Sequence, residues 1–320
     1  MKSLFSSGRI VTSMIDPGRV PVSKLQDPPK HAVGTKRRRQ GEEGFARTST
    51  HFMKIQLIAH RGIWDASVPQ NTLEAFRRAW ADGATWVETD FHHAKSGQMI
   101  CIHAEGELRK YTGCEKAIAD LTPDEVASLR LDPARFANGG VAPANPTPEV
   151  PFRIPFLHEV LATVPPHGTL QAEIKGYSAE YADLFDRAVR DAGLAEDNIV
   201  VSSFHFEALA DFHRRYPAYR TLLLLGVPKD GDRDVLAEIA RARDAGFDFF
   251  CPGLTPNDRS LTADELAAVR ASGMGFRVYG VNRPEDLRRA RDAGAGAFTC
   301  NFWHQAFDWA KDIGCVELLR

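Results

Sequence analysis

Short apolar runs alternate with amphipathic, helix-like segments along most of the chain. Eight runs are predicted to be barrel strands, and they start at Ile55, Thr85, Thr169, Ile199, Thr221, Phe247, Phe276 and Ala297. Eight βα units of this kind close into a TIM (β/α)8 barrel of about 250 residues. The competing fold, a doubly wound open sheet, fits less well because no Gly-rich phosphate motif follows the first strand.

We therefore predict one TIM-barrel domain at 53–320, with an insertion at 104–168 that contains a proline-rich loop at 143–151. Residues 1–52 lack hydrophobic periodicity and include the basic run 36–39, so a disordered leader is expected. A basic interaction arm and translation from Met53 are the alternatives, and the apolar part is too short for a secretory signal. Asn71 or Thr72 is expected to cap a helix at 73–81.

A β-hairpin is predicted to leave the barrel after the second strand. The turn at Ser96-Gly97 is too short for a parallel crossover, so the run at 99–102 should pair antiparallel with the strand before it. A turn centred between these two residues would place His103 opposite Asp90. Side chains alternate across a strand, so Glu88 and Asp90 should point to the same face.

The predicted strand ends bring charged side chains together. His60 and Arg61 follow the first strand, beside the carboxylates of the second, and Glu173 and Lys175 lie two residues apart on the next barrel strand. Three neighbouring acids, Glu88, Asp90 and Glu173, are typical of a site for a hard cation such as Mg²⁺ or Ca²⁺. The alternative is a set of buried ion pairs with Arg61 and Lys175, although burying charges only to hold a barrel together is costly.

The two histidines that flank these acids, His60 and His103, are expected to form an acid/base pair. His92 and His93 lie further along the hairpin and are expected on the rim or facing solvent. Arg61 is interpreted as a phosphate clamp because its fork matches phosphate oxygens. Lys175 either contacts the phosphate or pairs with Glu173.

Composition limits the classes of function. The chain has 320 residues and a formal net charge of -2, with 43% hydrophobic and 26% charged residues. This is ordinary for a soluble globular protein and gives no reason to expect a nucleic-acid partner. No apolar run approaches the ~20 residues that a membrane span requires. The five cysteines are odd in number and lack metal-type spacing, so Cys101, Cys251 and Cys300 are expected in the core of a cytoplasmic protein.

Taken in order, several motifs between residues 55 and 303 resemble those of the glycerophosphodiester phosphodiesterases, which are metal-dependent TIM barrels of the phospholipase C-like superfamily. The matching pieces are His60-Arg61-Gly62, Pro69-Gln70-Asn71-Thr72, Glu88-Thr89-Asp90, His103, the segment 154–161, Glu173-Ile174-Lys175, Ser202-Ser203-Phe204 and the segment 278–282. Each piece alone is weak, but the ordered series is specific.

The resemblance implies a role for each matched residue. It implies that His60 and His103 are the acid/base pair and that one divalent cation, Mg²⁺ or Ca²⁺, is bound by Glu88, Asp90 and Glu173. The resemblance does not say which histidine is the acid, and we favour His103. The residues expected to bind or support the substrate are Arg61, Lys175, Asn71, Phe204 and Asn282. The implied reaction hydrolyses a glycerophosphodiester, a small-molecule partner, to an alcohol and glycerol 3-phosphate.

The chain departs from the family pattern around the expected catalytic residues. Gln70 stands where the family usually has Glu, and Ala104 where it has Asp. Its late Thr-Asp is here Cys300-Asn301, and its Leu-x-Arg-Thr-Thr segment is changed at 108–112. These changes leave open another substrate, either a lysophospholipid or a sugar phosphodiester, in phospholipase D-like or agrocinopine synthase-like chemistry. A non-catalytic barrel that binds phosphodiesters is a further alternative. The alcohol and the oligomeric state stay open as well.

Overall fold

The structure is a computed structural model that describes residues 54–133, 150–176, 178, 180–229, 231, 233–315 and 317–319. The predicted leader at 1–52 and most of the proline-rich loop at 143–151 lie outside the described residues. No helix in the described part of the chain is long and apolar enough to cross a membrane.

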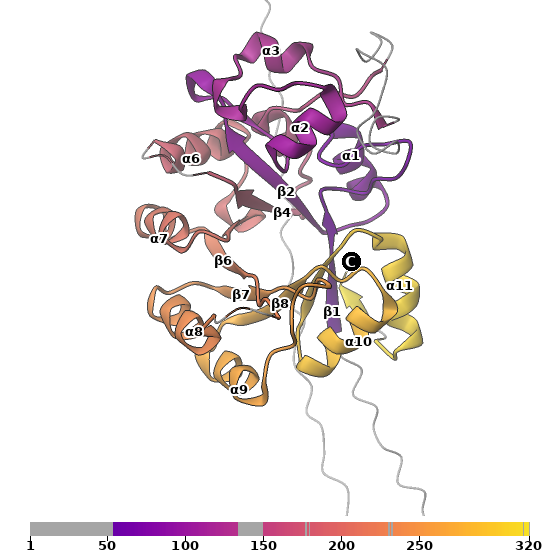
Figure 1. Cartoon of the computed structure of the whole chain (residues 1–320), viewed down its shortest axis with the longest axis vertical. Coiled ribbons are helices and arrows are strands. Elements are labelled where there is room, and N and C mark those ends of the chain that lie inside the picture. Colours follow the sequence, from indigo (N-terminus) through magenta and orange to yellow (C-terminus); the bar gives the residue numbers. More distant parts are fainter. Residues whose placement is uncertain are drawn as a thin grey trace, which may run out of the picture. The chain divides into compact units, whose positions relative to one another are not determined.

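Eight parallel strands form a closed barrel, which confirms the predicted TIM-barrel fold (Figure 1). They are β1 (Lys54–His60), β2 (Trp86–His93), β4 (Thr169–Ile174), β5 (Ile199–Ser203), β6 (Arg220–Leu225), β7 (Phe249–Pro252), β8 (Gly275–Tyr279) and β9 (Ala297–Cys300). Each pairs with the next, and β1 pairs with both β2 and β9, which closes the sheet. A short strand, β10 (Glu317–Leu319), pairs with the start of β1 outside this ring.

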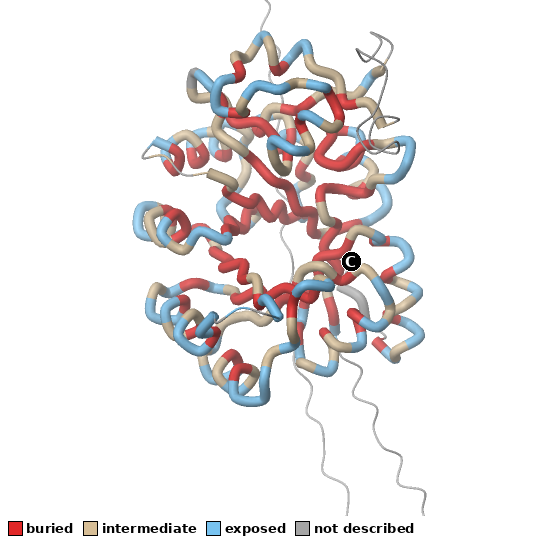
Figure 2. The backbone as a smooth tube through the Cα atoms, viewed as in Figure 1, coloured by how far each residue is buried: buried red, intermediate tan, exposed pale blue. Residues whose placement is uncertain are grey.

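Helices surround the barrel and bury one face each. They are α1 (Leu73–Ala81), α6 (Tyr181–Asp191), α7 (Phe206–Arg215), α8 (Val235–Asp244), α9 (Ala263–Ser272), α10 (Pro284–Ala293) and α11 (Trp303–Asp312). The α1 bounds agree with the predicted 73–81, and Thr72 is the N-cap, accepting a hydrogen bond from the backbone of Ala75. Figure 2 shows the strands as largely buried and the outer helix faces as exposed. Cys101, Cys251 and Cys300 are buried free thiols, as expected for core residues.

The segment between β2 and β4 carries a small core of its own. It contains β3 (Met99–Ile100), α2 (Glu105–Thr112), α3 (Pro123–Ser128) and α5 (Leu157–Leu161). Figure 1 shows α2 and α3 grouped near the arrow end of β2. Their apolar side chains cluster separately from the main core, around Ile100, Leu108, Val126 and Ile154. This cluster fixes α2 beside the ends of the barrel strands.

The predicted register of the hairpin is wrong by one residue. His92 pairs with Ile100 and His93 with Met99, so Asp90 does not face His103. The cause is a turn of 3-10 conformation at Lys95–Gly97, which centres the hairpin on residue 96. The return strand also ends early, because the Cys101 N–H donates to the Pro155 carbonyl at 2.9 Å instead of to β2. His103 is therefore positioned by the loop before α2.

The turn from β1 into α1 depends on a glycine. Gly62 has a φ of +81°, and a Cβ at this position would lie 2.6 Å from the carbonyl carbon of Ala75. The neighbouring Ile63 N–H donates to the Ala75 carbonyl at 3.0 Å, which holds the turn against α1. The turn therefore needs both a left-handed backbone and the absence of a side chain.

We predict that Gly62→Ala lowers the free energy of unfolding by roughly 1–3 kcal/mol, because it adds a backbone clash to the strain of the left-handed region. Gly83→Ala is the matched control, since Gly83 has a φ of +93° with nothing within 4 Å of an added Cβ. It should cost only about 1 kcal/mol. Urea unfolding of the two variants measures the difference, and equal losses would show that the contact with Ala75 is unimportant.

Candidate active site

A cavity of about 240 Å³ lies at the carboxyl ends of the barrel strands. The predicted site residues that line it are His60, Arg61, Glu88, His103, Glu173, Lys175, Phe204 and Asn282. Asp90 and Asn71 are buried, and Asp90 contacts the lining residues Arg61 and Lys175 as well as Asn71. The barrel thus gathers all ten residues expected from the sequence, although the hairpin register differs from the prediction. Asn301, at the end of β9, also lines the cavity.

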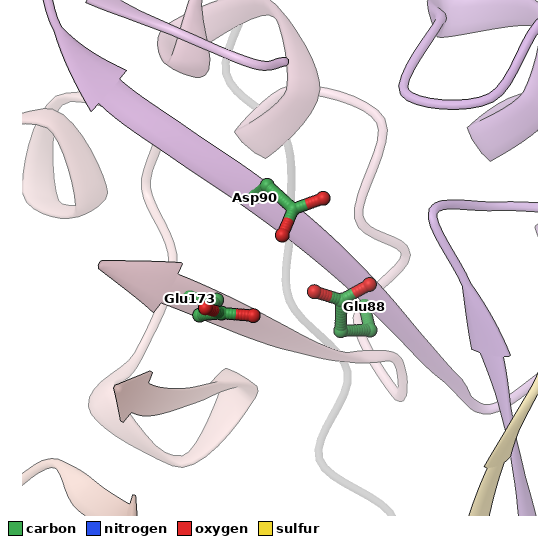
Figure 3. A group of neighbouring side chains, drawn as sticks. All are labelled: Glu88, Asp90 and Glu173. Atoms are coloured by element: carbon green, nitrogen blue, oxygen red, sulfur yellow. The ribbon is translucent and has the colours of Figure 1, made fainter. Parts of the chain in front are cut away.

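Three buried carboxylates form the centre of the site. Figure 3 shows Glu88 and Asp90 on β2 and Glu173 on β4 directed toward the same space. One oxygen from each lies within 4.8 Å of the other two. Asp90 and Glu173 are register partners on adjacent strands, so the sheet itself imposes this proximity. Oxygen ligands at such spacing suit a hard divalent cation.

Burial and mutual repulsion disturb the ionisation of these acids. Burial, together with the Asp90 charge, raises the pKa of Glu88 well above its usual range and that of Glu173 to about 7. Burial alone would also raise the pKa of Asp90, but Arg61 and Lys175 hold it well below its usual range. Arg61 Nε lies 2.7 Å and Lys175 Nζ 3.0 Å from the two Asp90 oxygens. Asp90 is thus ionised, whereas the other two carboxyls compete for protons.

His60 is the last residue of β1, and its ring reaches the cavity beside Glu88. Its Nδ1 is hydrogen-bonded to the Asn301 side-chain oxygen. Its Nε2 lies 3.8 Å from Glu88 Oε2. Burial and the nearby Arg61 charge lower the pKa of His60 to about 3. The ring is therefore neutral at pH 7, and the bond to Asn301 assigns the proton to Nδ1 and leaves Nε2 as an acceptor.

His103 faces the same cavity from the loop before α2. Its Nδ1 lies 3.5 Å from Glu107 Oε1, one helical turn later. Burial lowers the pKa of His103 to about 4. The ring of His92 contacts the His103 carbonyl at 3.0 Å, so His92 supports this loop. His92 and His93 are both half-buried, so of the two positions expected for them they occupy the rim and do not face solvent fully.

Sequence reasoning missed Glu107. One of its carboxylate oxygens accepts from Arg61 Nη1 at 3.0 Å, forms a short hydrogen bond with the Gln70 amide, and faces His103. Burial raises the pKa of Glu107 to about 7. The available signal was its i,i+4 spacing from His103 in a helical segment. Asn301 was noted only as the residue at the family's late Thr-Asp position, because its contact with His60 joins β9 to β1 across the closure of the barrel.

The remaining predicted residues support the site in different ways. Asn71 donates to Asp90 Oδ2 at 3.0 Å and accepts from the Thr89 hydroxyl at 3.1 Å. Phe204 is 42% exposed at the cavity rim, and Lys175 Nζ lies 5.9 Å from its ring centre. The Asn282 side-chain oxygen accepts from the backbone N–H of Asn301 at 3.1 Å.

Comparisons with known proteins agree with this geometry. The model of the glycerophosphoryl diester phosphodiesterase family matches residues 60–304. A glycerophosphodiester phosphodiesterase from Bacillus altitudinis is 26% identical over 251 residues, covering 76% of this chain and 94% of that protein. Two solved structures share the fold at low sequence identity. The glycerophosphodiester phosphodiesterase of Thermotoga maritima has a TM-score of 0.61 at 21% identity, covering 81% of this chain and 99% of that one.

The second structure is an Oleispira antarctica phosphodiesterase in complex with the product sn-glycerol-3-phosphate. It has a TM-score of 0.65 at 17% identity, covering 80% of this chain and 96% of that one. At these identities both structures support the barrel fold, whereas the family match rests on the sequence itself. Since that match spans most of the sequence, the chain belongs to the glycerophosphoryl diester phosphodiesterase family and is an enzyme of that class, as its motifs predicted.

Proposed function

We propose that the enzyme hydrolyses a glycerophosphodiester to an alcohol and glycerol 3-phosphate, using a divalent cation and the histidine pair His60 and His103. The observation that carries this proposal is a buried cluster of three carboxylates with two histidines at its edge, all reaching one cavity. The family relationship supports the phosphodiester chemistry. A barrel that only bound phosphodiesters would not need two histidines beside such a cluster.

The charge balance of the site fits a divalent cation. Four carboxylates, those of Glu88, Asp90, Glu107 and Glu173, lie near two cationic side chains, Arg61 and Lys175. Ion pairing explains the ionised Asp90, but Glu88 pairs with no Arg or Lys side chain among the described residues. With all four acids ionised, the excess is two negative charges, which one Mg²⁺ or Ca²⁺ would neutralise. A bound cation would polarise the phosphoryl oxygens.

The two cationic side chains are placed to orient the phosphate. Lys175 Nζ is held between Asp90 and Glu173, at 3.0 and 2.6 Å, and has a third donor available to a ligand in the cavity. Arg61 is held by Asp90 and Glu107 through two of its nitrogens. Because both side chains are fixed by carboxylates, they can present positive charge to a phosphodiester without rearrangement.

The contacts of the two histidines suggest different roles. His60 has Nε2 available as an acceptor, so it is suited to remove a proton from the attacking oxygen. His103 faces the Glu107 carboxylate, which can stabilise the imidazolium form and hold the ring so that the other nitrogen reaches the departing alcohol. Glu107 acts through His103 and is a positioning residue. An anionic substrate in the cavity would raise the low pKa of His103 toward the working pH.

The first prediction concerns pH and stability in the absence of divalent cations. The folded-state pKa of Glu173 is raised from 4.5 to about 7, so its contribution to stability is present below pH 4.5 and is lost as the pH rises through 7. In EDTA, the free energy of unfolding of Glu173→Gln should therefore rise by about 1–3 kcal/mol relative to that of the parent enzyme as the pH is raised from 5 to 8. The measurement is the Tm of Glu173→Gln minus the Tm of the parent enzyme, which should increase from pH 5 to pH 8 by roughly 2–4 °C for each kcal/mol gained.

Glu265→Gln provides a control of opposite sign. Glu265 pairs with Arg259 at 2.7 Å, and its hydrogen bond with that residue lowers its pKa below 4.5. This substitution should lower Tm similarly at pH 5 and pH 8, because both lie above the unfolded value. Adding Mg²⁺ or Ca²⁺ at pH 8 should raise the Tm of the parent more than that of Glu173→Gln. A Tm difference for Glu173→Gln that is independent of pH would contradict the assigned repulsion among the acids.

The second prediction tests the histidine roles. On an unactivated diester, His60→Ala and His103→Ala should each lower kcat/KM by roughly 10²- to 10⁴-fold. The double variant should be little worse than the poorer single one, because the residues act as a unit. A nitrophenyl diester needs little protonation of its leaving group, so His103→Ala should recover most of its activity there, and His60→Ala should not.

Two further variants complete this test. Glu107→Gln should lose less kcat/KM than His103→Ala on the unactivated diester and should likewise recover most of it on the nitrophenyl diester. A residue with a purely structural role would lose activity equally on both substrates. His158→Ala, at an exposed position on α5, is the control and should keep its activity. Near-normal rates of both histidine variants on the unactivated diester would overturn the acid/base assignment, and recovery of His60→Ala alone would exchange the two roles.

A further inference from the structure

A second cavity, of about 490 Å³, lies next to the first and has a different chemical character. Its lining is mainly apolar and aromatic, with Ile63, Trp64, Pro69, Tyr111, Phe302 and Trp303 among its residues. These belong to the turn between β1 and α1, to α2, and to the start of α11. Its volume is within the range of small-molecule pockets, which are about 300–1,000 Å³.

The second cavity adjoins the catalytic cavity at Asn301. Asn301 lines both, and its side chain is hydrogen-bonded to His60. Trp64, in the wall of the second cavity, donates from its indole nitrogen to the His60 carbonyl at 3.1 Å. Asn301 and Trp64 thus place this space next to His60, on the side where a group attached to a bound phosphate would need to enter it.

The charges around the second cavity are neutralised locally. Asp65 and Arg78 form an ion pair at 2.6 Å, and the His304 ring is hydrogen-bonded to the Asp82 carboxylate at 2.9 Å. Among the described residues that line this cavity, the two charged side chains Asp65 and Arg78 therefore compensate each other, in contrast to the catalytic cavity. Aromatic side chains instead offer apolar area with little loss of conformational entropy.

Apolar exposure in the described part of the chain is concentrated at these two cavities. Three large hydrophobic side chains are exposed among the described residues; Phe204 and Phe302 lie at the cavities, whereas Leu236 lies on α8. Phe204 is on the rim of the catalytic cavity, and Phe302, 44% exposed, lines the second one. Exposed apolar side chains gathered at a pocket indicate a surface that a ligand covers.

We propose that the second cavity is a subsite for an apolar group, alkyl or aromatic, attached to one of the two alcohols of the phosphodiester. This rests on the proposed function and specifies its substrate class as an amphipathic diester. The reaction is ordinary hydrolysis, in which a bond forms between the water oxygen and phosphorus, the bond from phosphorus to the leaving alcohol breaks, and that alcohol takes up a proton. The subsite adds affinity for the apolar group without changing this chemistry.

The test uses the full chain, loaded with Mg²⁺ or Ca²⁺, and a series of glycerophosphoalkanols from ethyl to hexyl. The proposal predicts that kcat/KM rises by roughly two- to fourfold per added methylene. A second arm compares lysophosphatidylethanolamine with glycerophosphoethanolamine, which places the apolar group on the glycerol side. A rise in either arm supports the subsite and tells which alcohol enters it, whereas a flat response in both overturns it.

Phe302→Ala should reduce the hexyl-to-ethyl ratio of kcat/KM by about fivefold or more, because it removes a large apolar wall. Leu236→Ala is the matched control, since Leu236 is 47% exposed on α8 and lines neither cavity. It should keep the parent ratio. An unchanged ratio in Phe302→Ala would overturn the proposal. If the mass in solution also fell, the surface would be a contact with a second copy of the chain.

A binding measurement keeps this proposal separate from the proposed function. Hexyl phosphate should change tryptophan fluorescence at a lower concentration than ethyl phosphate, because Trp64 and Trp303 line the subsite. Phe302→Ala should lessen this difference. If no diester is hydrolysed at all, the proposed function fails, and the fluorescence titration still decides the subsite. Equal responses to hexyl and ethyl phosphate would overturn it.

Discussion

Electrostatic repulsion among buried carboxylates is the constraint around which this barrel end is built. Glu88 and Asp90 share one face of β2, and the register of β4 places Glu173 beside Asp90. Parallel pairing leaves these side chains no alternative position, and burial removes the water that would screen them. The protein offsets part of this cost with Arg61 and Lys175. The remaining negative charge is the physical basis for a cation site.

The backbone near the site is strained where it contacts these acids. Among the described residues, Arg61 and Asn71 are the two non-glycine residues with positive φ, at 60° and 55°. Both side chains bind Asp90, at 2.7 and 3.0 Å. Such conformations cost on the order of 1–3 kcal/mol each and persist where surrounding contacts fix them. Here they direct the Arg61 guanidinium and the Asn71 amide at the Asp90 carboxylate. Gly62 allows the chain to turn from β1 toward α1 directly after Arg61.

The sequence predicted the features that follow from local hydrophobic patterns, namely strands, helices and the faces of strands. It missed the features that depend on contacts between segments distant in sequence. Strand and helix periods gave the eight barrel strands and the capped helix α1, and alternation on β2 put two acids on one face. The hairpin register failed because a 3-10 turn centres it on residue 96 and a contact with Pro155 ends the return strand. Such choices depend on neighbours distant in sequence.

The contacts of Glu107 and Asn301 escaped prediction for the same reason. Glu107 reaches Arg61 and Gln70 because α2 packs on its own small core, and Asn301 reaches His60 because β9 closes on β1. Strand periodicity says which residues end a strand but not which hydrogen bonds they make. The family motifs supplied the rest of the site by resemblance, including Asn71 and Phe204.

The measurement that tests the account most directly is cation binding by Asp90→Asn, followed by calorimetry together with turnover. The substitution keeps the shape of the side chain and removes its charge, so affinity for Mg²⁺ or Ca²⁺ should fall by more than about tenfold and turnover should fall with it. Asp186→Asn is a control, because Asp186 is a buried acid on α6 bound to Arg190 and Tyr219 outside the cavity. It should bind the cation normally. Unchanged cation binding by Asp90→Asn, or full parent activity in EDTA, would contradict the account.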